Sequence, residues 1–157
     1  MNEHYHKVGE IRLNENQQGF YQKLRSDVKR WINDNINKEN KWSDYVLAAP
    51  DLFHLLCRLS VDSGVPSVKK IKLVAGIAYF ISPIDLLPEA FLGPIGYLDD
   101  ISVAAYILND IINEVDPQIV RKYWAGEQDI LDLIKTILAN ADKMIGGKLW
   151  EKIRKKF

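Results

Sequence analysis

The chain has 157 residues, 47% of them hydrophobic, and its 21 basic side chains match its 21 acidic ones. This length predicts one domain with a real core, and the balanced charge gives no overall signal for nucleic-acid binding. The single cysteine, Cys57, excludes an internal disulfide and a cysteine-based zinc site.

The first half of the chain shows helical periodicity. Apolar residues recur at helical spacing within residues 14–32, where Asn14 and Gln17 stand three residues apart in a capping-box arrangement. The next helix is expected to have Ser43 as its N-cap. It contains Pro50, which either kinks one helix or begins a second.

The second half begins with the most apolar segment of the chain. Residues 67–81 are apolar all round after Lys72, which predicts the most buried helix, in the middle of a bundle. After several proline and glycine turns, Asp99 is expected to cap the next helix and Asp116 a short one. A further helix is expected to end at Gly146.

These patterns predict an all-α fold. It is a compact bundle of about six to seven helices around a buried central helix and a proline- and glycine-rich acidic hairpin. We expect a flexible N-terminus over residues 1–13 and a single helical domain over 14–147, with the hairpin at about 71–112. A basic amphipathic C-terminal helix should follow over 148–157.

The hairpin is unusual in its charge. Between Leu73 and Val120 there is no basic residue, and the seven acids there are Asp85, Glu89, Asp99, Asp100, Asp110, Glu114 and Asp116. A carboxylate among apolar groups must be paired, hydrogen-bonded, metal-bound or protonated. One interpretation is helix capping, with Asp99 as the cap and Asp100 in the positive first turn. Another is ion pairing with the flanking lysines.

The third interpretation is a shared cation site. Four carboxylates from both arms of the hairpin could converge on Mg²⁺, Ca²⁺ or Mn²⁺, which prefer oxygen ligands; they are Asp85, Glu89, Asp99 and Asp100. Such a cation would either hold the hairpin together or activate water for hydrolysis.

The same segment carries a family resemblance. Residues 79–89 (Tyr-Phe-Ile-Ser-Pro-Ile-Asp-Leu-Leu-Pro-Glu), with Gly-Tyr-Leu-Asp-Asp at 96–100, resemble the signature of the YkvA-like family. This is a bacterial domain family without an established activity, so the resemblance implies motif positions and no reaction. The motif positions are Ser82, Pro83, Asp85, Pro88, Glu89, Gly96, Asp99 and Asp100.

The C-terminal segment combines basic and aromatic residues. Those suited to an anionic membrane surface are Lys148, Trp150, Lys152, Lys155, Lys156 and Phe157. The alternative is that the apolar side of this helix packs on its own domain. The longest apolar run, Leu73 to Ile81, is too short to span a bilayer, and the N-terminal residues contain no apolar signal core. We therefore expect a cytoplasmic protein, with peripheral membrane contact as an option.

The sequence contains no evident nucleophile–base pair and no glycine-rich phosphate loop. It therefore favours a non-enzymatic helical module that binds a protein partner, either free or at the cytoplasmic face of a membrane. The alternative is a divalent-cation-dependent hydrolase that uses the carboxylates of the hairpin.

Overall fold

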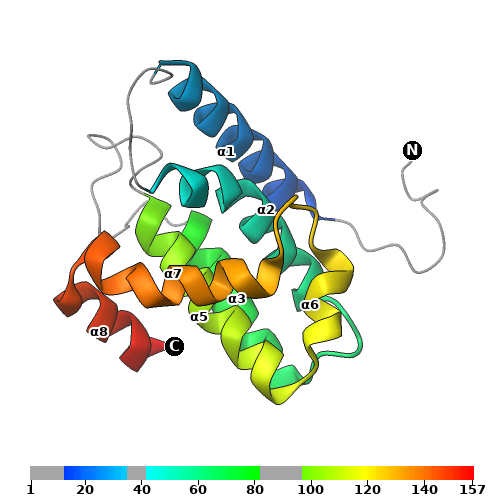
Figure 1. Cartoon of the computed structure of the whole chain (residues 1–157). Coiled ribbons are helices and arrows are strands. Elements are labelled where there is room, and N and C mark those ends of the chain that lie inside the picture. The colour runs from blue at the N-terminus through cyan, green and yellow to red at the C-terminus, as the bar shows by residue number, and fades with distance from the viewer. Residues whose placement is uncertain (1–12, 35–41, 82–96) are drawn as a thin grey trace, which may run out of the picture.

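The computed structural model describes residues 13–34, 42–81 and 97–157. Within these ranges the regular structure consists of helices and no strand, which confirms the all-α prediction (Figure 1). The helices are α1 (Glu15–Asp34), α2 (Ser43–Ser60), α3 (Ser67–Ile81), α5 (Leu98–Glu114), α6 (Pro117–Tyr123), α7 (Ile130–Ile145) and α8 (Gly147–Lys156).

Three helix ends follow the sequence: the start of α1, the start of α6 and the end of α7. The backbone N–H of Gln17 donates to Asn14 Oδ1 at 2.8 Å, and the N–H of Asn14 donates to Gln17 Oε1 at 3.1 Å, which confirms the capping box. Asp116 accepts from the N–H of Gln118 at 2.9 Å and caps α6. Gly146, with a φ of +90°, ends α7 in a backbone region that suits glycine.

Two predicted caps are wrong. Ser43 is the first residue of α2, and Trp42, at the cap position, makes no side-chain capping bond. Asp99 lies inside α5. The residue at the N-cap position of α5 is Tyr97, which likewise makes no side-chain capping bond. Pro50 stays within the continuous helix α2.

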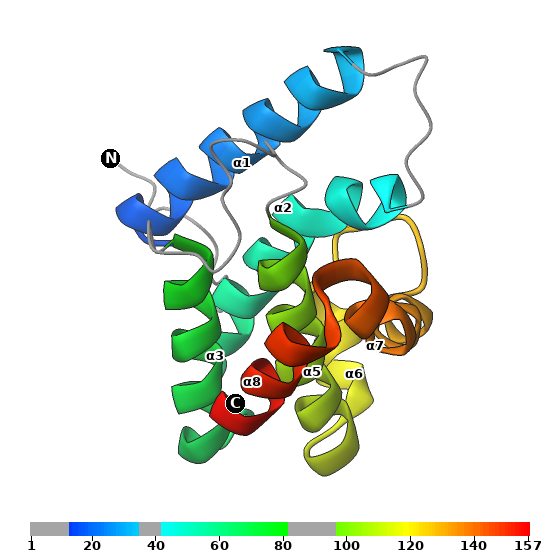
Figure 2. The same cartoon turned by 90° about the vertical axis from the view of Figure 1, so that its left-hand side faces the viewer.

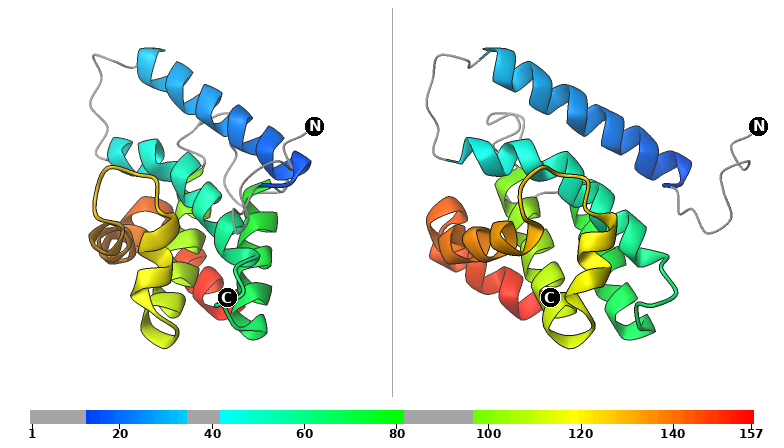
Figure 3. Two further views of the ribbon diagram at one scale, coloured as in Figure 1. Left: turned by 90° about the vertical axis from the view of Figure 1, so that its right-hand side faces the viewer. Right: turned by 45° about the vertical axis from the view of Figure 1, so that its right-hand side comes forward.

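The centre of the bundle is α5, where 11 of 17 residues are buried. Helices α2, α3, α6, α7 and α8 all pack against it, and Figures 1 and 3 show it among them. By contrast, α3 buries only Leu73, Gly76, Ile77 and Phe80. The prediction that residues 67–81 form the most buried helix is therefore wrong. An all-round apolar pattern fits either a central helix or an edge helix with a second apolar face, and α3 is the second kind.

Helix α3 stands at the side of the bundle, against α2 and α5 and beside the end of α8 (Figure 2). It approaches α5 closely at Gly76, where an added Cβ would lie 2.7 Å from Ile107 Cδ1. On the same face of α3, the ring of Phe80 meets that of Phe53 of α2, with centroids 5.4 Å apart. These contacts fix which face of α3 turns inward. None of the described helices is both long enough and apolar enough to span a membrane.

Candidate functional site

The face of α3 that turns away from the bundle is exposed and, beyond Ser67 at its start, apolar. We call it the outer stripe; its members are Val68, Ile71, Val74, Ala75, Ala78 and Ile81. The exposed fractions of the four large side chains run from 40% at Ile81 to 70% at Ile71. Only two other large apolar residues in the described part of the chain are as exposed, so the stripe concentrates most of this surface on one helix.

The lysines of α3 border the stripe and do not interrupt it. Lys69 points inward, where its ammonium lies 2.8 Å from Asp110 Oδ2 and 2.9 Å from Glu114 Oε1. Lys72 follows on one border, 3.5 Å from Asp110 Oδ2, with 36% of its side chain exposed. Helical spacing places Lys70 on the other border. The stripe is therefore bordered by a lysine on each side, Lys70 on one and Lys72, paired with Asp110, on the other.

The end of α8 adds a further cation at one border. The Phe157 ring packs on Tyr79 of α3 with centroids 5.9 Å apart, and Lys156 Nζ lies 6.0 Å from the Tyr79 ring. Trp150 packs edge-to-face on Tyr106 of α5 with centroids 5.7 Å apart. Both aromatic residues expected at a membrane surface thus make contacts within the bundle. Lys148, Lys152, Lys155 and Lys156 are exposed.

Part of the acidic motif can be placed. Asp99 and Asp100 are fully buried in the first turn of α5, and the Tyr79 hydroxyl donates to Asp99 Oδ2 at 3.1 Å. The predicted place of Asp100 in that turn is confirmed. The remaining motif residues, Ser82, Pro83, Asp85, Pro88, Glu89 and Gly96, lie outside the described residues. Among the described residues, no three His, Cys, Asp or Glu side chains are grouped as a metal site would require.

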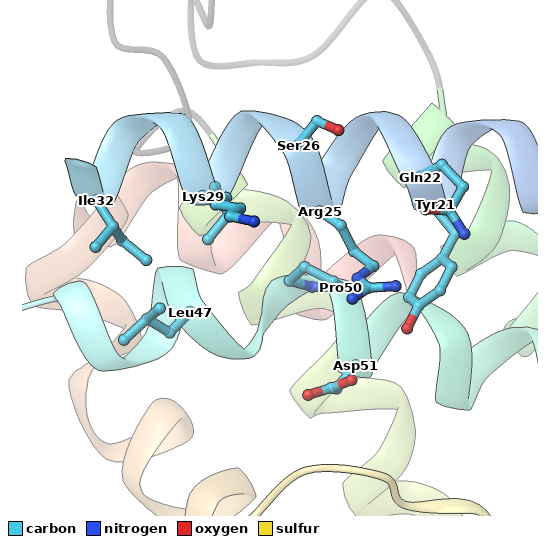
Figure 4. Close-up of a pocket in the computed structure, with 10 residues that line it drawn as sticks. Tyr21, Gln22, Arg25, Ser26, Lys29, Ile32, Leu47, Pro50 and Asp51 are labelled. Carbon is cyan, nitrogen blue, oxygen red and sulfur yellow. The ribbon is translucent and has the colours of Figure 1, made fainter. Parts of the chain in front are cut away.

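A separate cleft of about 580 Å³ lies between α1 and α2. Figure 4 shows Arg25 reaching from α1 to lie between Tyr21 and Pro50, with Asp51 below it on α2. Burial raises the pKa of Asp51, and the charge of Arg25 opposes that shift. Ile32 lies toward the other end of the cleft. Its walls mix both charges with apolar groups, so it lacks the uniform chemistry of the outer stripe.

Two reactive residue types sit in structural settings. Cys57 is 2% exposed, and burial raises the pKa of its thiol to about 12, which suits a structural and not a nucleophilic cysteine. Burial also lowers the pKa of His54, whose ring packs against Tyr21 with centroids 5.2 Å apart.

Residues 69–106 match a family profile described as "Protein of unknown function (DUF1232)". The matched segment runs from the first turn of α3 to the middle of α5, so it includes most of the outer stripe and the buried pair Asp99 and Asp100. The chain is also 29% identical over 108 residues to "Uncharacterized protein ORF9" of Methanothermobacter thermautotrophicus, a match covering 69% of this chain and 74% of that protein. No solved structure matches significantly. The similarity is therefore to proteins described without a function.

Sequence reasoning missed the outer stripe. Residues 73–81 carry no charge on any side, so the sequence does show an apolar surface all round this helix. That surface was interpreted as burial inside the bundle. Only the packing of α3 shows that half of this apolar surface faces outward.

Proposed function

We propose that this chain is a non-enzymatic helical module that binds a protein partner through the outer stripe of α3. The observation that carries the proposal is the exposure of Val68, Ile71, Val74 and Ile81 on one helix at the side of the bundle. Contiguous apolar surface on a small domain marks an interaction site more often than it does chance exposure. The YkvA-like resemblance of the neighbouring motif adds no reaction to this proposal.

The size of the stripe limits what it can do alone. Complete burial of a valine or isoleucine side chain stabilises by about 1.5–3 kcal/mol. The four large side chains are roughly half exposed, so covering them would contribute roughly 3–7 kcal/mol. Association itself costs at least about 4 kcal/mol in lost freedom of motion. A stable complex therefore needs contacts beyond the stripe, and the lysines at its borders are placed to supply them.

The test compares three forms of the full chain, each purified from its native cells under identical conditions. Ile71→Glu places a charge in the stripe without changing the buried face of α3. Lys135→Glu is the matched control on the exposed side of α7. A protein that copurifies with the parent and the control, but is lost with Ile71→Glu, supports the proposal once its direct binding to the purified parent is shown.

Folding of Ile71→Glu is checked by helical circular dichroism and by its denaturant midpoint, which should stay near that of the parent. Equal recovery of every partner by parent and Ile71→Glu would remove the stripe from the account.

Contact with an anionic membrane is a second candidate, favoured by the exposed lysines of α8 beside the stripe. Cosedimentation of the full chain with vesicles of phosphatidylcholine and phosphatidylserine tests it. Binding should weaken as salt rises, because surface charge is then screened. Loss of binding in a Lys152→Glu, Lys155→Glu variant would assign the contact to α8.

The cation-dependent hydrolase stays as the alternative from another class, favoured by the burial of Asp99 and Asp100 side by side. Its test is thermal unfolding with added Mg²⁺, Ca²⁺ or Mn²⁺. A cation that bound the native state would raise the midpoint of the parent, and Asp85→Asn should abolish the rise.

A further inference from the structure

We infer that the outer stripe receives an amphipathic helix of the partner whose apolar seam is bordered by acidic side chains. This inference rests on the proposed function and adds to it the chemistry of the partner. It is carried by two features of α3, the register of its exposed residues and the sign of the charges beside them.

The register suits a second helix. Val68, Ile71, Ala75 and Ala78 follow one another at spacings of three, four and three residues, which is the spacing of a coiled-coil seam. Val74 and Ile81, seven residues apart, widen the seam on one side. Ala75 and Ala78 are small and lie in its second half, so another helix can approach the α3 backbone closely there.

Beyond the lysines that pair with Asp110 and Glu114 of α5, the charges that α3 and α8 bring to the borders are positive. Helix α3 carries three lysines and no acid, and α8 carries five basic side chains and one acid, Glu151, which pairs with Arg154 at 2.8 Å. Lys70 and Lys72 border the stripe near its start, and Lys156 stands beside Tyr79 near its end. Lys72 already faces Asp110, so acidic side chains on the partner helix would meet Lys70 and Lys156 at the exposed rim, where such pairs mainly set orientation and choice of partner.

A second copy of this chain fits the same surface poorly. A symmetric pair would place α3 against α3, and each helix would bring its own lysines to the shared border. Like charges placed opposite one another across an interface are unfavourable, so the cationic borders disfavour self-association.

A lipid surface also fits less well. Helices that lie in a membrane interface commonly anchor through tryptophan or phenylalanine. The exposed large side chains of the stripe are aliphatic, and the nearby Trp150 and Phe157 pack on Tyr106 and Tyr79.

The experiment titrates the full chain into two labelled synthetic helices of about three heptads and follows fluorescence anisotropy. Both peptides have leucine in the seam; one has glutamate at the bordering positions and the other has lysine there. We expect the acidic peptide to bind about tenfold more tightly or better, and its affinity to fall as salt increases.

Variants of the chain then locate the contact. Ile71→Glu should reduce binding of the acidic peptide by about tenfold or more, and Lys135→Glu should leave it unchanged. Exchanging the border charges, with Lys70→Glu and Lys156→Glu together, should weaken binding of the acidic peptide and strengthen binding of the basic peptide. These opposite changes also guard against a general loss of folding, which would weaken both.

Equal binding of the two peptides, or binding of neither, would overturn the inference of an acidic partner helix. The proposed function would still be decided separately by the copurification test. Binding that ignores Ile71→Glu would overturn both. A dimer of the free chain that Ile71→Glu dissociates would assign the stripe to a second copy. Phosphatidylserine vesicles that bind the parent and not Ile71→Glu would assign it to lipid, and either result would overturn the inference.

Discussion

The ammonium of Lys69 lies 2.8 Å from Asp110 Oδ2, and this pair joins the first turn of α3 to the C-terminal half of α5. Only 14% of the Lys69 side chain and 19% of the Asp110 side chain are exposed, so the pair is largely shielded from water. It holds Lys69 on the inner side of α3. Together with the contacts of Gly76 and Phe80, it sets the rotation of α3, and the apolar outer face has no lysine within it.

This pair should make stability depend on pH in a predictable way. Hydrogen bonds to Asp110 and Glu114 raise the pKa of Lys69. Burial alone would raise the pKa of Asp110, but the hydrogen bond from Lys69 and the neighbouring lysine charges bring it below its usual value. A lowered carboxyl pKa contributes stability above about pH 4 that is lost as pH falls through the folded value, and a raised lysine pKa contributes below about pH 10.

We therefore predict that Lys69→Met destabilises the chain between about pH 4 and pH 10, and that the difference from the parent shrinks beyond both limits. Urea unfolding at several pH values measures it. Lys135→Met, on the exposed side of α7, is the control and should change little. A Lys69→Met effect that stays constant from acid to alkaline pH would contradict this role of the pair.

The two faces of α3 should respond differently to truncation. Ile77 is 6% exposed and Val74 is 56% exposed, although they lie one turn apart, Ile77 on the buried face and Val74 at the adjoining edge of the outer stripe. Ile77→Ala should destabilise by about 2–4 kcal/mol, because it empties a packed site. Val74→Ala should stay within about 0.5 kcal/mol, since it removes surface that already faces water. Denaturant unfolding of the isolated chain measures the change in unfolding free energy for both variants. Similar losses of stability at the two positions would mean that Val74 is buried in the folded chain, which would contradict an exposed outer stripe.

A hydrogen bond between Tyr123 and Asp62 ties α6 to the turn between α2 and α3. The Tyr123 hydroxyl donates to Asp62 Oδ2, and this bond lowers the pKa of Asp62. Burial, together with Asp62, raises the pKa of Tyr123 to about 12. The carboxylate contributes stability above about pH 4, and the protonated phenol contributes fully below about pH 10 and loses this as pH rises toward 12.

We predict that Tyr123→Phe costs about 1–3 kcal/mol at neutral pH, because the bond has a charged acceptor that is largely buried. The loss should be smaller below about pH 4, where Asp62 becomes protonated. Thermal or urea unfolding at pH 3 to 7 tests both points. Tyr106→Phe, which removes the hydroxyl of another tyrosine, is the control. Asp62 also accepts from the N–H of Gly64 at 2.6 Å and lies 3.8 Å from the ammonium of Lys122. No loss at neutral pH would show that these two contacts hold Asp62 without Tyr123.

The thiol of Cys57 should be inert while the chain is folded. It is buried in α2 and its pKa is raised to about 12, so almost no thiolate exists at neutral pH. A disulfide reagent should therefore label it only at the rate of unfolding, and rapidly in denaturant. Fast labelling of the native chain would contradict the packing of α2.

Features set by residues close in the chain could mostly be predicted, with the Ser43 cap as an exception, and features set by distant residues could not. The capping box of Asn14 and Gln17 depends on neighbours three residues apart and was predicted correctly. The place of α3 depends on Lys69 meeting Asp110, 41 residues further on, and no local pattern reports that. Asp99 was predicted to be a helix cap, and the structure buries it with a hydrogen bond from Tyr79. Its burial and this bond are likewise set by packing between distant segments, so the local sequence does not reveal them.

The outer stripe is tested most directly by a photocrosslinking scan along α3 in the native cell. A photoreactive phenylalanine analogue replaces, one at a time, Ile71, Val74 and Ala78 of the stripe, and Lys29 and Lys135 on other exposed surfaces. We predict an adduct with one and the same partner from every stripe position, and none from Lys29 or Lys135. Equal adducts from all five positions, or none from the stripe, would contradict the assignment of α3 as the docking surface.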